Sequence, residues 1–200
     1  MKINFIDLGA YKGDTIDIFL NSIKKSKNID YRIFGVEAFP NIFNICENKF
    51  KNNDKVQIYN FAIGLLEGPT KLYYGRNFDI GQDKACSIHI ESKNILPSKY
   101  IYVNCIKFST WFNTLNIDKK DINIIKSNME GAELELVKDM DEHNLFEYFD
   151  YYTGNLDYWT NDIRKMINCN EDVEYVINTL LKHNIKFTPL TEINLDEYSI

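Results

Sequence analysis

The side chains best suited to chemistry in this sequence are acids that stand at the ends of short apolar runs. Asp7 lies near the end of the first run, Glu37 directly follows the second, and Glu130 comes shortly after a third. Carboxylates accept hydrogen bonds from hydroxyls, balance a positive charge or remove a proton. Lys126 adds an ammonium group just before Glu130. These residue types predict a binding site for a ligand with hydroxyl and cationic groups, next to a general base.

The first acid belongs to a stretch typical of a strand, a glycine turn and a helix start. Residues 3–8 form an apolar run of buried-strand length, and Gly9 and Gly13 bracket a turn that needs positive φ or close backbone approach. Residues 16–23 then place apolar side chains at helical spacing. The start of such a helix offers unpaired N–H groups and a positive dipole end, which suit an anionic or carboxylate-bearing ligand.

The second acid ends a predicted strand over residues 31–37. A carboxylate at this tip lies where the ribose hydroxyls of a bound nucleoside are found. The glycines follow D-x-G-x-x-x-G and not G-x-G-x-x-G, which leaves Asp7 before the first glycine. That acid suits the ammonium group of S-adenosylmethionine and would repel a pyrophosphate. A nicotinamide-dependent oxidoreductase with the same nucleoside half is therefore disfavoured.

A third strand, turn and helix follow over residues 121–137. The apolar run ends in a polar tip, and helical spacing resumes at Leu134. In an open α/β sheet such a tip lies at the carboxyl ends of the strands, beside the crevice where ligands bind. We therefore expect Lys126, Asn128 and Glu130 to border the pocket.

The remaining elements continue this alternation, which predicts an α/β fold with a doubly wound, mostly parallel sheet and helices on both faces. We expect a single domain over residues 1–200. Ser109 is the expected cap of one of the helices. The expected helices cover residues 39–51, 109–115, 134–140, 157–167 and 172–183, and the expected strands cover residues 56–63, 70–74, 100–106, 122–125, 148–152 and 185–190.

A long stretch over residues 76–99 lacks a clear period. Loops of this length in a compact domain are usually functional or mobile. We interpret it as a lid or a substrate-contacting segment, with a disordered excursion as the alternative. His89 lies within it, where simple exposure competes with a role in substrate contact.

Aromatic residues cluster in the last third of the chain. Their rings suit stacking on a sugar or an aromatic acceptor, but packing in the core and at its rim is the favoured explanation for most of them. The cluster comprises Tyr148, Tyr151, Tyr152, Tyr158 and Trp159.

Bulk properties narrow the function classes. The 200 residues suit one domain with a substantial core, and the net charge of -6 with a pI near 5.1 argues against nucleic acid as the main partner. The four cysteines form no C-x-x-C pair, so neither a zinc site nor a disulfide framework is predicted. Because no apolar run reaches the length of a membrane span, we expect a cytoplasmic protein without one.

Taken together, these motifs resemble the FkbM family of S-adenosylmethionine-dependent methyltransferases, over about residues 3–140. Four motifs carry the resemblance, at residues 5–15, 35–40, 62–64 and 125–133. The first motif is common to most class I methyltransferases. The fourth is more specific to this family, and its usual form is lysine, an apolar residue, aspartate, any residue and then Glu-Gly-Ala-Glu.

The resemblance implies a class I, Rossmann-like fold with a seven-stranded sheet, and S-adenosylmethionine as cofactor. Asp7, Gly9 and Gly13 would cradle its methionine part, Glu37 would hold the ribose, and residues 60–62 would lie near the adenine. The full implied set of cofactor-binding residues is Asp7, Gly9, Ala10, Gly13, Thr15, Glu37, Ala38, Asn60, Phe61, Ala62 and Asn128.

Two departures from the family pattern stand out. Asn128 occupies the place of the family aspartate, where it keeps the hydrogen-bonding shape and loses the charge. Family members also usually carry further sequence before the first strand, which helps to cover the pocket. The acceptor site is then expected to be open, or to be completed by a second copy of the chain or a neighbouring domain.

The expected activity is O-methylation of a hydroxyl acceptor, and the resemblance implies a sugar or glycan. Glu130 is the first candidate base, Asp150 the second, and Lys126 an orienting or charge-balancing group. The alternative for Glu130 is a first-turn acid that stabilises the next helix. A non-catalytic S-adenosylmethionine-binding or scaffold protein is the alternative function. No metal is expected, although Asn128, Glu130 and Asp150 would offer the oxygen ligands that magnesium accepts.

Overall fold

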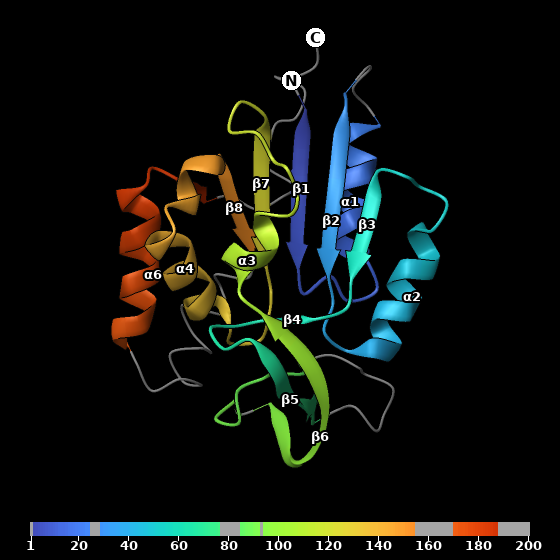
Figure 1. The fold of residues 1–200 in the computed structure, drawn as a ribbon, viewed down its shortest axis with the longest axis vertical. Helices are drawn as coiled ribbons and strands as arrows, with labels where there is room; N and C mark the ends of the chain where they lie inside the picture. Colours follow the sequence, from blue (N-terminus) through green and yellow to red (C-terminus); the bar gives the residue numbers. More distant parts are fainter. Residues whose placement is uncertain (1, 25–28, 77–84, 93, 155–169, 188–200) are drawn as a thin grey trace.

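The computed structural model describes residues 2–24, 29–76, 85–92, 94–154 and 170–187. Among these residues the main sheet has six strands, all parallel, in the order β3-β2-β1-β7-β8-β9 (Figure 1). All carboxyl ends therefore meet at one edge of the sheet. The strands are β1 (Ile3–Leu8), β2 (Tyr31–Val36), β3 (Val56–Tyr59), β7 (Ile122–Ser127), β8 (Tyr151–Gly154) and β9 (Lys186–Phe187).

The two central strands, β1 and β7, are buried along their whole lengths. This burial explains why both read as nearly continuous apolar runs and not as an alternating pattern. Their register pairs Ile3 with Ile122 and Asp7 with Lys126. The same register makes Asn4 a direct neighbour of Asn123, so polar residues of the two strands meet near the start and again near the end of the pair.

Helices cover both faces of the main sheet, as the doubly wound prediction requires (Figure 1). On one face the rings of Phe5 and Phe19 stack 4.7 Å apart, and Phe50 of the second helix joins the same cluster. On the other face Ile125 packs in one cluster with Leu136. The first face carries α1 (Asp14–Ile23) and α2 (Pro40–Phe50), and the second carries α3 (Phe108–Phe112), α4 (Glu133–Glu142) and α6 (Asn170–Lys182).

A second, smaller sheet lies beyond the carboxyl edge of the first (Figure 1). Its order is β4-β6-β5, formed by β4 (Ala62–Ile63), β5 (Gly68–Gly75) and β6 (Ile95–Ile106). Among the described residues the main sheet thus has six of the seven strands that the resemblance implies. The expected strand over residues 56–63 divides at Asn60, whose Nδ2 donates to the carbonyl oxygens of Glu37 (2.8 Å) and Ala38 (3.1 Å). That side chain ties the bend to the tip of β2, and the chain leaves the main sheet there.

Three other expected boundaries also differ. The strand expected over residues 148–152 begins only at Tyr151, because a 3₁₀ turn, η2 (Leu145–Tyr148), precedes it. Ser109 lies inside α3 and not at its cap. Its backbone N–H and its hydroxyl both donate to the carboxylate of Asp139. β6 starts at Ile95, before the expected position. The helix expected over residues 157–167 lies outside the described residues, as does the end of the last strand.

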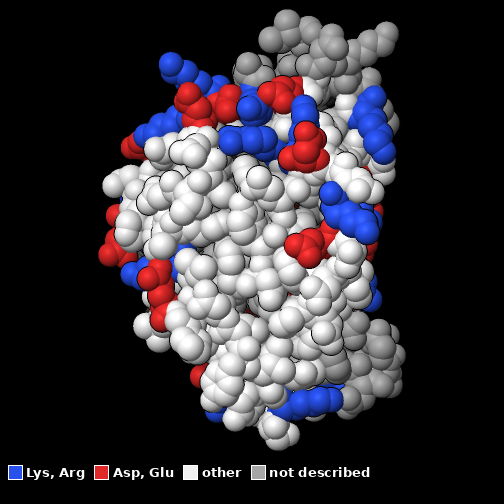
Figure 2. Space-filling model, turned by 45° about the vertical axis from the view of Figure 1, so that its right-hand side comes forward, with Lys and Arg blue, Asp and Glu red and all other residues white. Residues whose placement is uncertain are grey.

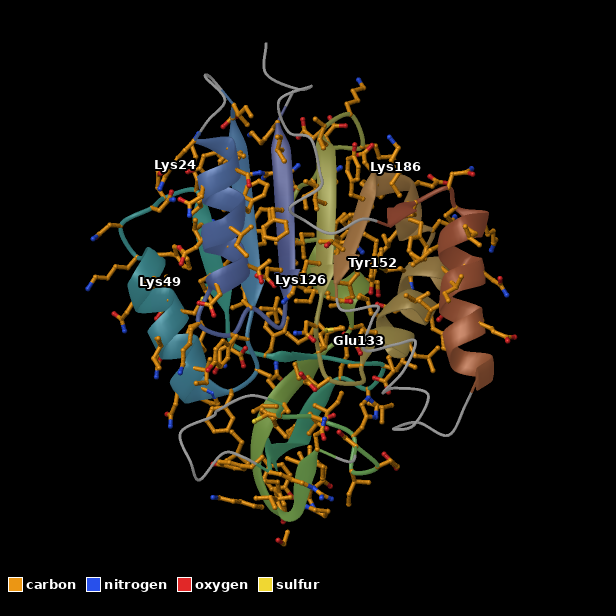
Figure 3. All side chains as sticks on the ribbon, turned by 180° about the vertical axis from the view of Figure 1, so that it is seen from behind. Lys24, Lys49, Lys126, Glu133, Tyr152 and Lys186 are labelled. Carbon is orange, nitrogen blue, oxygen red and sulfur yellow. The ribbon has the colours of Figure 1, made fainter. Side chains whose placement is uncertain are left out.

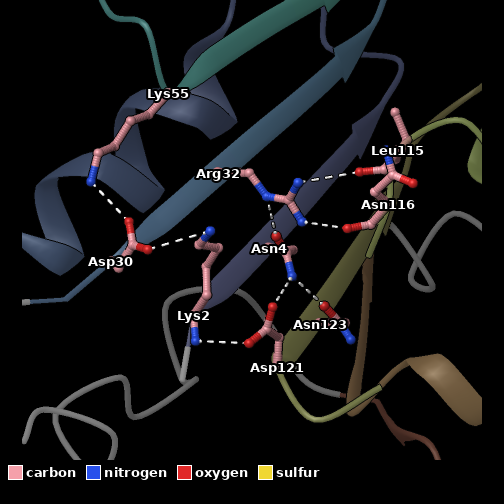
Figure 4. Close-up of polar contacts among 9 residues, drawn as sticks. All are labelled: Lys2, Asn4, Asp30, Arg32, Lys55, Leu115, Asn116, Asp121 and Asn123. Atoms are coloured by element: carbon pink, nitrogen blue, oxygen red, sulfur yellow. Dashed lines mark hydrogen bonds and ion pairs between the residues drawn. The ribbon is translucent and has the colours of Figure 1, made fainter. Parts of the chain in front are cut away.

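The amino edge of the main sheet carries a closed polar network (Figure 4). Asn4 is fully buried; its Nδ2 donates to Asn123 Oδ1 (2.7 Å), and its Oδ1 accepts from Arg32 Nε (3.0 Å). Arg32 also donates to the carbonyl oxygens of Leu115 and Asn116. Each buried polar group here thus gains a partner from a different element, which joins β1, β2 and β7 at this edge.

Surface charges also lie beside these buried groups, such as Asp30, which pairs with Lys2 (Figure 4). On the face shown in Figure 2, basic and acidic side chains surround a broad uncharged area. Several surface charges form ion pairs, such as Lys55 with Asp30 at 3.0 Å. In the part of the chain that the structure describes, no helix combines the length and apolar character needed to span a bilayer.

Candidate functional site

A cavity of about 270 Å³ lies at the carboxyl edge of the main sheet, where it meets the small sheet. Its wall combines the glycine turn, the tips of β2 and β7, and parts of the small sheet. Most of the residues predicted from the sequence meet here. Those that line the cavity are Gly9, Ala10, Thr15, Glu37, Ala38, Phe61, Ala62, Lys126, Asn128 and Glu130.

Four predicted site residues do not line the cavity: Asp7, Gly13, Asn60 and Asp150. Several lining residues were missed instead. Asp14 starts α1, directly after the glycine turn, so its position beside the cavity could have been predicted from the sequence. The positions of Leu72 and of the segment 85–88 could not have been predicted in this way, because these residues reach the cavity only through the small sheet. The other missed residues are Tyr11, Val36, Phe39, Ile63, Met129 and Ala132.

The two glycines of the turn serve different contacts. Gly9 has φ +76°, and a Cβ there would lie 2.0 Å from the carbonyl oxygen of Asn128. The tip of β7 approaches that closely because Asn128 N–H donates to the carbonyl of Leu8 (2.9 Å). Gly13 has φ +82°, and its Cβ would lie 2.3 Å from the ring of Phe50. Gly13 therefore makes room for Phe50 of α2, and it does not line the cavity.

Glu37 links the tip of β2 to the glycine turn. Its Oε2 accepts from Tyr11 N–H (2.9 Å) and its Oε1 from Phe39 N–H (2.8 Å). Burial raises the pKa of Glu37, while these two backbone donors oppose the rise. Each carboxylate oxygen has a second lone pair, so Glu37 can still accept hydrogen bonds from hydroxyls in the cavity that it lines.

Asp7 and Lys126 form a buried ion pair beneath the cavity. Asp7 Oδ1 lies 2.7 Å from Lys126 Nζ, and Asp7 is fully buried. Burial raises the pKa of Asp7, and the ammonium of Lys126 opposes this rise. Lys126 also donates to the carbonyl of Gly9 (2.8 Å). Asp7 pairs with its neighbour in the β1–β7 register and does not line the cavity, and its contact with a ligand stays a prediction.

Glu130 stands in a tight turn between β7 and α4. It has φ +56°, in the left-handed region, and Gly131 follows with φ +118°. Glu133 closes the turn, since its carboxylate accepts from Met129 N–H (2.6 Å) and Gly131 N–H (2.9 Å). Figure 3 shows Glu133 and Lys126 near one another at this edge of the sheet, far from Lys24 and Lys186 at the opposite edge.

The environment of Glu130 gives it the acidity of a general base. Burial, and next the charge of Glu133, raise the pKa of Glu130 to about 7, against an opposing effect of Lys126. A carboxylate with this pKa accepts a proton readily near neutral pH. The alternative role as a first-turn helix acid is wrong for Glu130, because α4 begins at Glu133.

Asp150 lies at the other end of the sheet. It directly precedes β8, and its Oδ2 accepts from the backbone N–H of Asn123 (2.9 Å), near the start of β7. Asp150 therefore cannot act as a base in this cavity, nor bind a metal together with Asn128 and Glu130. Among the described residues, no three His, Cys, Asp or Glu side chains gather in the arrangement that a metal ion needs.

The described part of the long stretch over residues 76–99 contributes to the cavity wall. Ser87 pairs with Tyr73 of β5 through both backbone groups, at 2.8 and 3.2 Å. This pairing carries Ala85, Cys86 and Ile88 into the lining of the cavity. The interpretation of the stretch as a lid or a substrate-contacting segment stays a prediction, and residues 77–84 and 93 lie outside the described part.

The tyrosines of β8 pack in the core. Tyr152 is 1% exposed and its hydroxyl pairs with Ser127, while burial raises the pKa of that phenol. Tyr148 packs edge to face on Phe112, at 5.2 Å between ring centroids. The packing interpretation is confirmed for these residues, and Tyr158 and Trp159 lie outside the described part of the chain.

The fold and the cavity together define a doubly wound, Rossmann-like α/β protein with an acidic site at the carboxyl edge of its sheet. The model of the methyltransferase FkbM domain matches residues 7–153, and the chain belongs to this family. Methyl transfer is thus the class of reaction that the family supports.

Comparisons with individual proteins add one solved structure. It is the crystal structure of methyltransferase FkbM from Methylobacillus flagellatus KT, with 14% sequence identity and a TM-score of 0.41. The match covers 72% of this chain and 31% of that protein, so the chain spans about a third of its length. No protein with a curated description matches this chain significantly.

Proposed function

We propose that this protein transfers a methyl group from S-adenosylmethionine to a hydroxyl of a sugar or glycan. The charge distribution around the cavity is the observation that supports this best. Asp14, Glu37 and Glu130 line the cavity, and the lining cation, Lys126, is balanced by Asp7. An acidic cavity favours a ligand with a sulfonium and an ammonium group and disfavours a pyrophosphate.

The residues present suit the parts of this cofactor. Glu37 lines the cavity with free lone pairs, which suit the two ribose hydroxyls. Phe39, Phe61 and Ala62 supply apolar surface for an adenine ring. Asp14, at the start of α1, offers a carboxylate for the amino group of the methionine part. When bound, the cofactor would supply an electrophilic methyl group.

In the proposed reaction Glu130 removes the proton of the acceptor hydroxyl. The bound cofactor would supply the methyl group to the acceptor oxygen and leave as S-adenosylhomocysteine, and the hydroxyl proton would go to the carboxylate of Glu130. Lys126 has a positioning role, because its contacts with Asp7 and the Gly9 carbonyl fix the glycine turn beside the reacting groups. A sugar or glycan is the acceptor class that the resemblance to the family implies.

A non-catalytic S-adenosylmethionine-binding protein is the second candidate. Asn128 favours it, because a neutral amide lines the cavity where the family has a carboxylate. The two candidates agree on cofactor binding and differ in turnover. Loss of methyl transfer in Glu130→Gln with retained cofactor binding would separate them in favour of the enzyme.

The first test is calorimetric titration of the folded protein with S-adenosylhomocysteine, beside an identical titration with NAD. Binding of S-adenosylhomocysteine without binding of NAD is the expected result. The opposite pattern, or no binding of either ligand, contradicts the proposal. A screen of glycans with radiolabelled S-adenosylmethionine then tests the acceptor class, with transfer of label as the readout.

A further inference from the structure

Ser87 brings the small sheet into contact with the turn that carries Glu130. It is 1% exposed, and both of its backbone groups pair with Tyr73 on β5. Its hydroxyl donates to the backbone carbonyl of Glu130 (2.8 Å) and accepts from His89 N–H (3.1 Å). All polar groups of Ser87 are thus in use, and one of them reaches the residue proposed as the base.

The backbone of Glu130 needs such support. A residue with a side chain costs free energy in the left-handed region and persists there only when its surroundings hold it. Glu133 holds the N–H groups on either side of Glu130, and Ser87 holds the carbonyl. These bonds come from two different parts of the fold, because Glu133 belongs to α4 and Ser87 follows β5.

His89 extends the same contact along the turn. A Cβ on Gly131 would lie 3.5 Å from His89 Cδ2, so the imidazole packs directly over this glycine. His89 Nε2 lies 3.8 Å from Glu135 Oε1, and Glu135 Oε2 accepts from Leu65 N–H (3.2 Å). The segment that carries Ser87 and His89 therefore rests on both the turn and the first turn of α4.

We propose that Ser87 is a positioning residue, which fixes the Glu130 turn from the small sheet so that the carboxylate faces the acceptor side of the cavity. This inference rests on the proposed function, in which Glu130 is the base. It assigns the small sheet a task in catalysis in addition to closing the cavity. Proton removal needs the base within hydrogen-bond reach of the acceptor, so a loosened turn slows turnover without weakening cofactor binding.

Ser87→Ala tests the proposal against Ser92→Ala as the matched control. Ser92 lies in the same segment and is also buried, but its hydroxyl has no hydrogen-bond partner among the described residues. The first readout is the titration of Glu130, followed by NMR of carboxyl-labelled glutamate and assigned with Glu130→Gln. The second is the affinity for S-adenosylhomocysteine, and the third is kcat with an acceptor found by the glycan screen.

In Ser87→Ala we expect the Glu130 midpoint to fall from about 7 toward the value of an exposed glutamate, because the loosened carboxylate gains water. We expect kcat to fall by about tenfold or more with KM and S-adenosylhomocysteine affinity unchanged. Ser92→Ala should match the wild type in every readout. An unchanged Glu130 titration in folded Ser87→Ala would overturn the proposal.

Ser87→Cys keeps the question answerable if the alanine variant does not fold. The thiol fills a similar volume but is a weak donor, so the same fall in midpoint is expected and its absence is again contradictory. The titration needs neither cofactor nor acceptor. A wild-type protein that fails to bind S-adenosylhomocysteine would therefore refute the proposed function, while the comparison of midpoints still decides the role of Ser87.

Discussion

Polar side chains gather at both edges of the main sheet. They are paired with one another at the amino edge, whereas they line a cavity at the carboxyl edge. At the amino edge the buried side chains of Asn4 and Asn123 find partners in one another, in Arg32 and in nearby carbonyls. At the carboxyl edge Glu37 and Glu130 line a cavity, and burial raises the pKa of both. The difference teaches that burial with full pairing stabilises a fold, whereas burial beside a cavity prepares groups for a ligand.

Asp7 and Lys126 show that a place at the carboxyl edge does not by itself leave a charged group available to a ligand. They lie at the carboxyl edge, yet they neutralise one another, and Lys126, the one of the two that lines the cavity, also binds the Gly9 carbonyl. A charged pair of this kind supports the geometry of a site and contacts the ligand less directly. The following predictions test whether the two edges differ as described, and they are ordered from the largest effect to the smallest.

Glu130→Gln should separate the edges most clearly. Loss of the base is expected to lower kcat by about a thousandfold, because general base catalysis is worth that order of magnitude. Affinity for S-adenosylhomocysteine should not change. Asp150→Asn at the amino edge is the control, and its kcat should match the wild type in the same methyl-transfer assay. A similar loss of turnover in both variants would contradict the assignment.

Asn123→Ala should damage stability and spare the cavity. The change leaves Asn4 Nδ2 and the carbonyls of Asp118 and Tyr148 without their buried partner. We expect the free energy of unfolding to fall by about 3 kcal/mol, measured by urea denaturation. Asn48→Ala, on the exposed side of α2, should change it by less than about 0.5 kcal/mol. Equal effects of the two variants would show that the amino-edge network contributes little.

The raised pKa of Glu130 predicts a stability cost that depends on pH. The folded protein keeps this proton up to a higher pH than the unfolded chain, so stability is lost as the pH rises from about 4.5 to about 7. Glu130→Gln should therefore stabilise the fold at pH 8 by about 2 kcal/mol and have little effect at pH 4. Urea denaturation at both pH values measures this, with exposed Glu47→Gln as control. A pH-independent effect of Glu130→Gln would contradict the prediction.

Glu37→Gln should give the smallest of these effects, in binding. The amide keeps the shape but presents donors where Glu37 accepts, so it loses a bond to Tyr11 or Phe39 and one to the ribose. We expect about a tenfold weaker affinity for S-adenosylhomocysteine, measured by calorimetry. Thermal unfolding of the free variant shows whether it is folded. Unchanged affinity in a folded variant would remove Glu37 from the proposed cofactor site.

Much of the carboxyl edge was predictable because its signals are local. The apolar run of β1, the two glycines and the acid after β2 follow one another at distances that a single helix and loop must span. The turn before α4 was also placed correctly, together with Lys126 and Glu130. Periodicity and glycine positions report such local geometry well.

Other features depended on pairing between distant segments. Asp150 was misplaced because the residues before β8 are as aromatic as the strand, and only the 3₁₀ turn over Leu145–Tyr148 fixes where the strand begins. The departure of β4 from the main sheet rests on hydrogen bonds of Asn60 to the tip of β2. Hydrophobic patterns carry no information on which sheet a short strand joins.

The sequence by itself determined the central βαβ unit, the glycine turn and the acids at the strand tips, because neighbouring residues define each of them. Tertiary structure decided how those groups are used. The register of β1 against β7 made Asp7 the partner of Lys126. The small sheet brought Ser87 onto the carbonyl of Glu130. Both outcomes arise from contacts between residues far apart in the chain, which only the folded structure brings together.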